Sequence, residues 1–188
     1  MSAFSVLQTE RLILRSWRDS DREPFAQLTA DPEVMRFFPS TLTRAESDAL
    51  VDRLQAHERA HGFTFWAVEE RASGAFLGFV GLARTPFQAH FTPCVEIGWR
   101  LEKDAWGKGY ASEAARESLR HAFEQLDLDE VVSFTAEINQ PSRKVMERIG
   151  MHHDPREDFD HPNVAAEHPL RRHVLYRLPK EAWKSPRP

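Results

Sequence analysis

The chain has 188 residues, of which 41% are hydrophobic and 29% charged, so it can bury one core but is short for two domains. Its net charge is −4 and its basic residues are scattered, which argues against a nucleic-acid partner. The sequence has no long apolar run and no signal-peptide pattern, so we expect no membrane partner. The single cysteine, Cys94, is consistent with a cytoplasmic location.

The first predicted elements are a strand over residues 12–14 and a helix that ends near Ala30. Aspartates in the segment 19–21 can cap the start of this helix, and Asp31-Pro32 disfavours its continuation. An apolar loop with Phe37 and Phe38 follows. Phenylalanines in such a loop pack into the core or line a pocket, and the sequence leaves both readings open.

A second helix is predicted from the capping-box pattern Thr43-x-x-Glu46 to Gly62. It ends in His57-Glu58-x-x-His61, a pattern found in zinc peptidases, where the two histidines share one helix face. Here Gly62 ends the helix at once, and no acid stands at the expected distance downstream. We interpret the pair as solvated histidines at a helix end, with a zinc metallopeptidase as the alternative.

Two apolar runs, 65–68 and 75–82, flank a turn at 72–74 and predict an antiparallel hairpin. The strand that pairs with this hairpin is predicted at 95–101, where apolar residues alternate. The spacing of apolar residues changes from two to about 3.6 across Gly107 and Gly109, so a helix follows the glycines.

The start of that helix is a candidate anion site. Its first amide groups lack partners within the helix, and the helix dipole adds partial positive charge there. Gly107 and Gly109 let the backbone approach a phosphate, and Lys108 adds a full charge. A tight turn with a solvated lysine explains the same residues. The Walker pattern fails at Gly109, and a dinucleotide loop would need its third glycine at Ser112.

The rest of the chain predicts a buried strand at 131–136, a helix from Pro141 to Gly150 and a last strand at 174–178. The segment 152–161 is rich in histidine and aspartate, but its spacing fits no metal site, so we interpret it as a polar loop. We expect one domain over residues 1–180 and a mobile tail over 181–188.

Three motifs together resemble the core of the GCN5-related N-acetyltransferases. They are Glu96-Ile97-Gly98-Trp99, the run from Trp106 to Ala114, and Asn139-x-x-Ser142-x-x-Val145-x-Glu147-x-x-Gly150-Met151. The segments 9–15 and 31–34 resemble the branch that includes the ribosomal-protein N-terminal acetyltransferases. One departure is Trp106, which stands where the family usually has Gln or Arg.

The resemblance implies a mixed α/β fold. Its central sheet would be mostly antiparallel, with about seven strands and about four flanking helices, and would splay after the fourth strand. It also implies an enzyme that moves an acetyl group from acetyl-CoA, its cosubstrate, to a primary amine without a metal. The acceptor would be a small molecule or a protein N-terminus, and the protein a monomer or homodimer. A non-catalytic domain that binds acyl-CoA is the main alternative.

The resemblance also assigns roles to residues. Glu96 would take the proton of the amine, and Ser142 would hydrogen-bond the departing thiolate. Glu96 is otherwise a solvent-facing strand residue, and Asn139 is otherwise only a helix cap. Phe37, Phe38 and Glu96 would bind the acceptor. The residues expected to bind the coenzyme are Ile97, Gly98, Trp99, Trp106, Gly107, Lys108, Gly109, Tyr110, Ala111, Ser112, Asn139 and Ser142.

Overall fold

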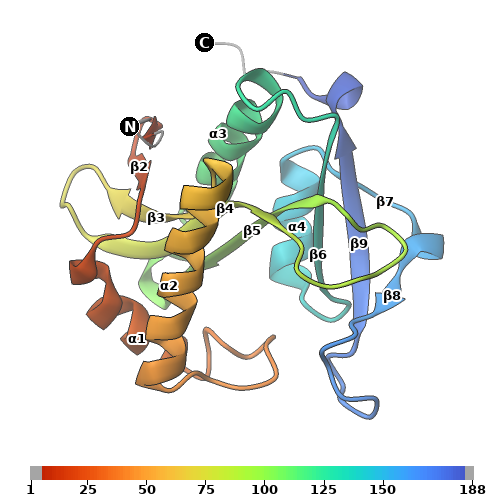
Figure 1. Ribbon diagram of the computed structural model, residues 1–188, viewed down its shortest axis with the longest axis horizontal. Helices are drawn as coiled ribbons and strands as arrows, with labels where there is room; N and C mark the ends of the chain where they lie inside the picture. The colour runs from red at the N-terminus through yellow and green to blue at the C-terminus, as the bar shows by residue number, and fades with distance from the viewer. Residues whose placement is uncertain (1–5, 185–188) are drawn as a thin grey trace.

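One twisted sheet runs through the computed structural model, which describes residues 6–184 (Figure 1). Within those residues it has nine strands in the order β1-β2-β3-β4-β5-β6-β9-β7, with β8 also paired to β9. The strands are β1 (Leu7–Gln8), β2 (Leu12–Arg15), β3 (Phe65–Glu70), β4 (Phe76–Arg84), β5 (Val95–Leu101), β6 (Glu130–Ala136), β7 (His152–His153), β8 (Phe159–Asp160) and β9 (Arg172–Pro179).

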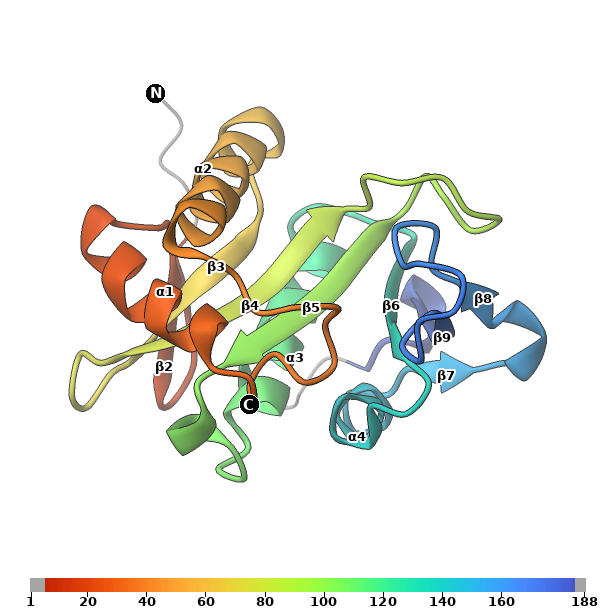
Figure 2. The ribbon, with the colours of Figure 1, turned by 90° about the horizontal axis from the view of Figure 1, so that it is seen from below.

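Two pairs of α-helices cover the two faces of the sheet (Figure 2). On one face, α1 (Arg22–Ala30) and α2 (Arg44–His61) pack over a cluster that includes Phe79. On the other, α3 (Tyr110–Glu124) and α4 (Gln140–Arg148) pack over the larger cluster. Short 3-10 helices span Asp19–Asp21, Lys103–Ala105, Pro155–Glu157 and Lys180–Ala182. The predicted mixed α/β fold with four main helices is confirmed.

The helix boundaries follow the predicted caps. The side chain of Thr43 accepts a hydrogen bond from the Glu46 amide, and Glu46 reaches back to the Thr43 amide. Gly62 ends α2 in the left-handed conformation at φ 79°, which a residue without a Cβ adopts without strain. Both ends of α2 are therefore set by local residues.

Strands β5 and β6 are the one parallel pair in the described sheet, and they separate almost at once. Their register contains a single pair, Glu96 with Val132. Beyond it, the Ser133 hydroxyl donates to the Ile97 carbonyl across 2.9 Å. The splay expected after the fourth predicted strand is thus confirmed, and that strand is β5 once the short β1 is counted.

The sheet has nine strands in the described residues, where about seven were expected. Three strands that the sequence pattern did not predict are β1, β7 and β8, each only two residues long. A segment of this length has too few residues to show an alternating pattern, so only its tertiary pairing reveals it. Part of the expected tail is also described, since Trp183 packs on Phe123 with ring centroids 5.6 Å apart. Residues 185–188 of that tail lie outside the described residues.

We predict that Gly81→Ala destabilises the protein by roughly 3 kcal/mol, because overpacking against backbone cannot be relieved by a rotamer change. A Cβ at Gly81 would lie 2.2 Å from the Thr64 carbonyl oxygen. Gly74→Ala is the control: a Cβ there meets nothing within 4 Å, so only the positive φ costs about 1 kcal/mol. Urea unfolding measures both, and equal losses would contradict the packing argument.

Candidate functional site

A cavity of about 1180 Å³ opens where β5 and β6 separate. Its walls come from the loop between α1 and α2, from β5, from the turn before α3, from β6 and from the start of α4. Every residue assigned a role above lines this one cavity. Segments up to about a hundred residues apart in sequence therefore meet at the splay.

The alternation of β5 divides the cavity into two sides. Ile97 and Leu101 are buried in the cluster beneath α3, and Trp99 packs against that cluster. Glu96 and Arg100 lie on the opposite face of the strand, since successive side chains alternate. Gly98 lies between them, and a Cβ there would be 3.2 Å from the Phe65 ring. The side beneath α1 and α2 therefore holds the strand's two ionisable groups.

Glu96 lies in an environment that disfavours its charge. No hydrogen bond or ion pair reaches its carboxyl group from a described residue. Burial alone raises the pKa of Glu96 to about 8, because a carboxylate loses solvation in the cavity wall. An acid with a pKa near neutrality that lines a cleft is a candidate for proton transfer.

The start of α3 presents unpaired amide groups to the cavity. Gly109 is the N-cap, in the left-handed conformation at φ 81°, and no side chain caps the helix. The first amide bonded to the helix is that of Glu113, to the Gly109 carbonyl. The amides of Tyr110, Ala111 and Ser112 therefore have no described acceptor, and together with the helix dipole they favour an anion.

Arg11 braces this turn from outside. Its Nη1 donates to the Lys108 carbonyl at 3.0 Å, and its Nε donates to Glu113 at 2.7 Å. Its guanidinium also lies 4.6 Å from the centre of the Tyr110 ring. Because the carbonyl and amide of one peptide point in opposite directions, fixing the Lys108 oxygen turns the Gly109 amide away from Arg11. The ion pair also neutralises an acid in the first turn of α3.

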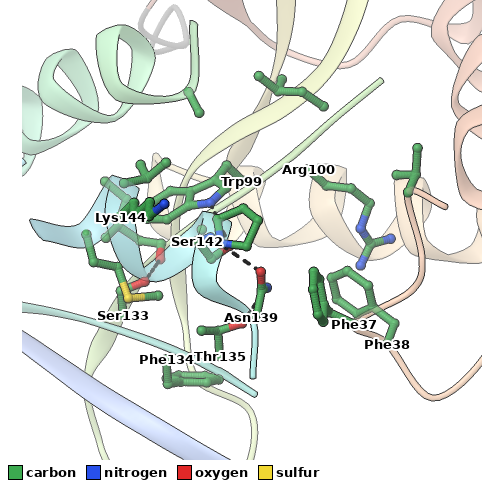
Figure 3. Close-up of a pocket in the computed structure, with 18 of the residues that line it drawn as sticks. Phe37, Phe38, Trp99, Arg100, Ser133, Phe134, Thr135, Asn139, Ser142 and Lys144 are labelled. Atoms are coloured by element: carbon green, nitrogen blue, oxygen red, sulfur yellow. Dashed lines mark hydrogen bonds between the residues drawn. The ribbon is translucent and has the colours of Figure 1, made fainter. Parts of the chain in front are cut away.

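A hydrogen bond crosses the cavity from β5 to α4 (Figure 3). The indole Nε1 of Trp99 donates to the Ser142 hydroxyl oxygen at 3.1 Å. The side chain of Asn139 accepts from the Ser142 amide and donates to Thr135, so it is the N-cap of α4. The cap explanation for Asn139 is thus observed, while direct contact with the coenzyme stays a prediction. The Ser142 hydroxyl still has its proton to donate.

The cavity includes residues that the sequence analysis did not select, and Arg100 is one of them. It lies beside the predicted Phe37 and Phe38, on the side away from Trp99 and Ser142 (Figure 3). Other cavity-lining residues that were not selected include Phe65, Phe79, Phe134, His161, Val164, Leu170 and His173. Alternation along β5 could have placed Arg100 with Glu96. The approach of the segment around His161 to β6 has no local signal.

The histidine pair at the end of α2 is not a metal site. Nδ1 of His57 donates to the Phe63 carbonyl at 2.8 Å, and Nε2 accepts the Arg84 amide at 3.0 Å. Both ring nitrogens are therefore used, and no lone pair is left for a metal. Glu58 is buried and bonds Ser16 instead. This geometry removes the support for the zinc peptidase alternative.

The histidine and aspartate segment forms separate contacts. His153 pairs with Asp158 at 2.8 Å, whereas the rings of His161 and His173 are tilted by 47° with centroids 4.8 Å apart. Burial lowers the pKa of His173 to about 4, which keeps its ring neutral. No helix within residues 6–184 is both long and apolar enough to cross a lipid bilayer.

Comparison with known proteins defines the family. The family described as acetyltransferase (GNAT) domain matches residues 11–152. The chain therefore belongs to the GCN5-related N-acetyltransferase family and is an acetyltransferase. The family resemblance read from the three motifs is confirmed.

Three similar proteins illustrate the match. The FsC-acetyl coenzyme A-N(2)-transacetylase of Aspergillus fumigatus is 33% identical over 192 residues, covering 97% of this chain and 80% of that protein. An acetyltransferase from Agrobacterium tumefaciens superposes with a TM-score of 0.77 at 26% identity, covering 95% and 96% of the two chains. A putative ribosomal-protein-serine acetyltransferase from Vibrio cholerae shares the fold, with a TM-score of 0.75, 18% identity and coverage of 95% and 99%.

The raised pKa of Glu96 predicts a pH-dependent loss of stability. The folded protein binds this proton more tightly than the unfolded chain, whose carboxyl has a pKa near 4.5. The resulting stabilisation is complete below pH 4.5 and is lost as the pH rises through about 8. We compare the melting temperature of Glu96→Gln with that of the wild type at two pH values. The difference in favour of the variant should be several degrees larger at pH 9 than at pH 5. A constant difference would contradict the burial of this acid.

Proposed function

We propose that this chain transfers an acetyl group from acetyl-CoA to a primary amine by direct attack. One observation carries the proposal: the unpaired amides at the start of α3 and the carboxyl group of Glu96 line the same cavity at the splay. The first suits the phosphates of a large anionic carrier, and the second suits removal of a proton from an ammonium group.

The coenzyme would bind on the side of β5 that faces α3 and α4. Its diphosphate would contact the amides from Gly107 to Ser112, with Lys108 beside them. Its pantetheine arm would pair with the backbone of Ile97 to Trp99, left without a partner strand where β6 departs. With the coenzyme bound in this way, its thioester would lie at the splay between β5 and β6.

The acceptor would bind on the side that holds Phe37, Phe38 and Glu96. Glu96 removes a proton from the ammonium group, directly or through water, and the neutral amine attacks the thioester carbon. A carbon–nitrogen bond forms and the carbon–sulfur bond breaks. The proton that the attacking nitrogen then loses passes to the departing thiolate, directly or through water, so the coenzyme leaves as a free thiol. Amides near Gly98 stabilise the carbonyl oxygen, and Ser142 donates a hydrogen bond to the departing sulfur. An α-amine, with a pKa of about 8, needs less help than a lysine at about 10.4.

The alternative is a domain of the same fold that binds acyl-CoA without turnover. The proton acceptor Glu96 and the free hydroxyl proton of Ser142 favour catalysis. The name of the Aspergillus fumigatus relative also describes an acetyl-CoA-dependent transfer to nitrogen. Incubation of the purified protein with acetyl-CoA and a panel of amines separates the two functions. Release of free thiol that depends on an amine supports the enzyme, whereas binding of acetyl-CoA without release supports the alternative.

Glu96→Gln should lower kcat/KM by roughly 100-fold or more, since a positioned general base contributes about that much, and should leave the affinity for CoA unchanged. In the wild type, kcat/KM should rise with pH up to about 8, because the base acts only when deprotonated. Thiol-release assays from pH 6 to 9 measure both effects. Glu102→Gln is the control, because Glu102 follows the same strand but lies outside the cavity. An unchanged rate for Glu96→Gln would remove Glu96 from the mechanism.

Arg11→Met should weaken CoA binding by roughly tenfold, because a hydrogen bond to a charged group contributes about that much and Glu113 loses its counter-charge. The change frees the Lys108 carbonyl and leaves a negative charge near the diphosphate. Isothermal calorimetry with CoA measures the loss. Arg120→Met removes a similar ion pair from the other end of α3 and should have no effect. Equal affinities for Arg11→Met and wild type would disprove the bracing role.

A further inference from the structure

Arg100 is half-buried, and its positive charge has no acidic partner among the described residues. Its Nε and Nη1 atoms are enclosed by the protein and have no hydrogen-bond partner among the described residues. Burial lowers its pKa to about 10, and no neighbouring acid counters this effect. The guanidinium therefore remains charged at neutral pH in an environment that does not compensate the charge.

The guanidinium of Arg15, which is buried, has acidic partners within the fold. Arg15 is 6% exposed, and its nitrogens lie 2.7 Å from Asp21 and 2.8 Å from Glu69. A buried cation is costly to leave unpaired, and removal of one partner from a buried pair is strongly destabilising. Arg15 thus finds its counter-charges within the fold, whereas Arg100 lacks one. A ligand that enters the cavity can supply it.

The aromatic ring that covers the Arg100 guanidinium on one side belongs to a loop and can be displaced. The Phe38 ring lies 4.0 Å from the guanidinium and the Phe79 ring 5.3 Å. Phe79 is buried in β4, but Phe38 is 37% exposed and belongs to the loop between α1 and α2 (Figure 3). A ligand can replace the Phe38 ring against the guanidinium without disturbing the sheet.

Arg100 also has a fixed relation to Glu96. The two residues are four apart on the same face of β5, so their Cα atoms lie about 13 Å apart at ~3.3 Å per residue. Side chains on one face of a strand project in the same direction, so extended side chains of Glu96 and Arg100 keep their charged groups about as far apart as their Cα atoms. A hydrogen bond of about 3 Å at each end then leaves roughly 7 Å between the two charged groups of a ligand that reaches both. The two groups of an α-amino acid share one carbon and are too close for this span.

We propose that Arg100 binds a carboxylate of the acceptor, which makes the substrate a primary amine whose carboxylate lies several bonds away. The proposal rests on the acetyl transfer described above. An ω-amino acid such as 6-aminohexanoate has the required separation. The ammonium group is placed at Glu96 and the carboxylate at Arg100, so the two unpartnered groups of β5 match the two charges of one molecule.

A matched pair of acceptors tests this proposal. 6-Aminohexanoate and 6-aminohexanamide share the amine and the chain but differ in charge at the far end. We expect the wild type to prefer the carboxylate in kcat/KM by about 10- to 100-fold, as a hydrogen bond to a charged group implies. Arg100→Met should lose the preference and retain the rate with the amide. Arg100→Lys should keep part of the preference, and Arg53→Met, on an exposed face of α2, should keep all of it.

A binding measurement separates this proposal from the proposed function. Calorimetry of 6-aminohexanoate with protein saturated with free CoA needs no turnover. Binding to the wild type but not to Arg100→Met, with equal CoA affinities in both, supports the carboxylate site even if no acetylation occurs. If the amide is acetylated as well as the carboxylate, or if Arg100→Met binds the carboxylate equally, the proposal fails while acetyl transfer stands.

The same assay distinguishes two sources of the carboxylate. Short peptides with aspartate or asparagine at the third position present the same charge difference on a protein N-terminus. We expect 6-aminohexanoate to be preferred over the aspartate peptide. A reversed order, abolished by Arg100→Met, would keep the role of Arg100 but show that the acceptor is a peptide N-terminus and not an ω-amino acid.

Discussion

The separation of β5 from β6 is the constraint on which the site depends. The two strands share one registered pair, Glu96 with Val132, while β4 pairs with every residue of β5. A strand held on one edge and released on the other keeps a row of free backbone groups without losing its own position. The Ser133 hydroxyl then holds the Ile97 carbonyl and limits how far the opening extends. The cavity is thus a consequence of strand pairing.

Because β5 is fixed by β4, its alternation gives each side of the cavity its own chemistry. Trp99 lies on the side of α3 and α4, where unpaired amides and hydroxyl groups gather. Glu96 and Arg100 lie on the side of α1 and α2, where aromatic rings dominate. The carrier and the acceptor can therefore approach the same strand from opposite faces, and they meet only at the splay.

The parts of this structure that depend on local chemistry were predictable. Thr43 with Glu46 marks the start of α2, and Gly109 marks the start of α3, because caps and positive φ angles are set by a few neighbouring residues. The role of Arg100 was not predictable, since a sequence does not show that no acid lies beside a cation. The wall around His161 was missed because it depends on how a distant loop packs against β6.

The bond from Trp99 to Ser142 has a consequence for polarity. An indole N–H can only donate, so it occupies a lone pair of the serine oxygen and leaves the hydroxyl proton to point elsewhere. The direction of the Ser142 hydroxyl dipole is therefore set when the protein folds, before any substrate arrives. Electrostatic preorganisation of this kind spares the reacting group the reorientation that solvent dipoles would need during turnover.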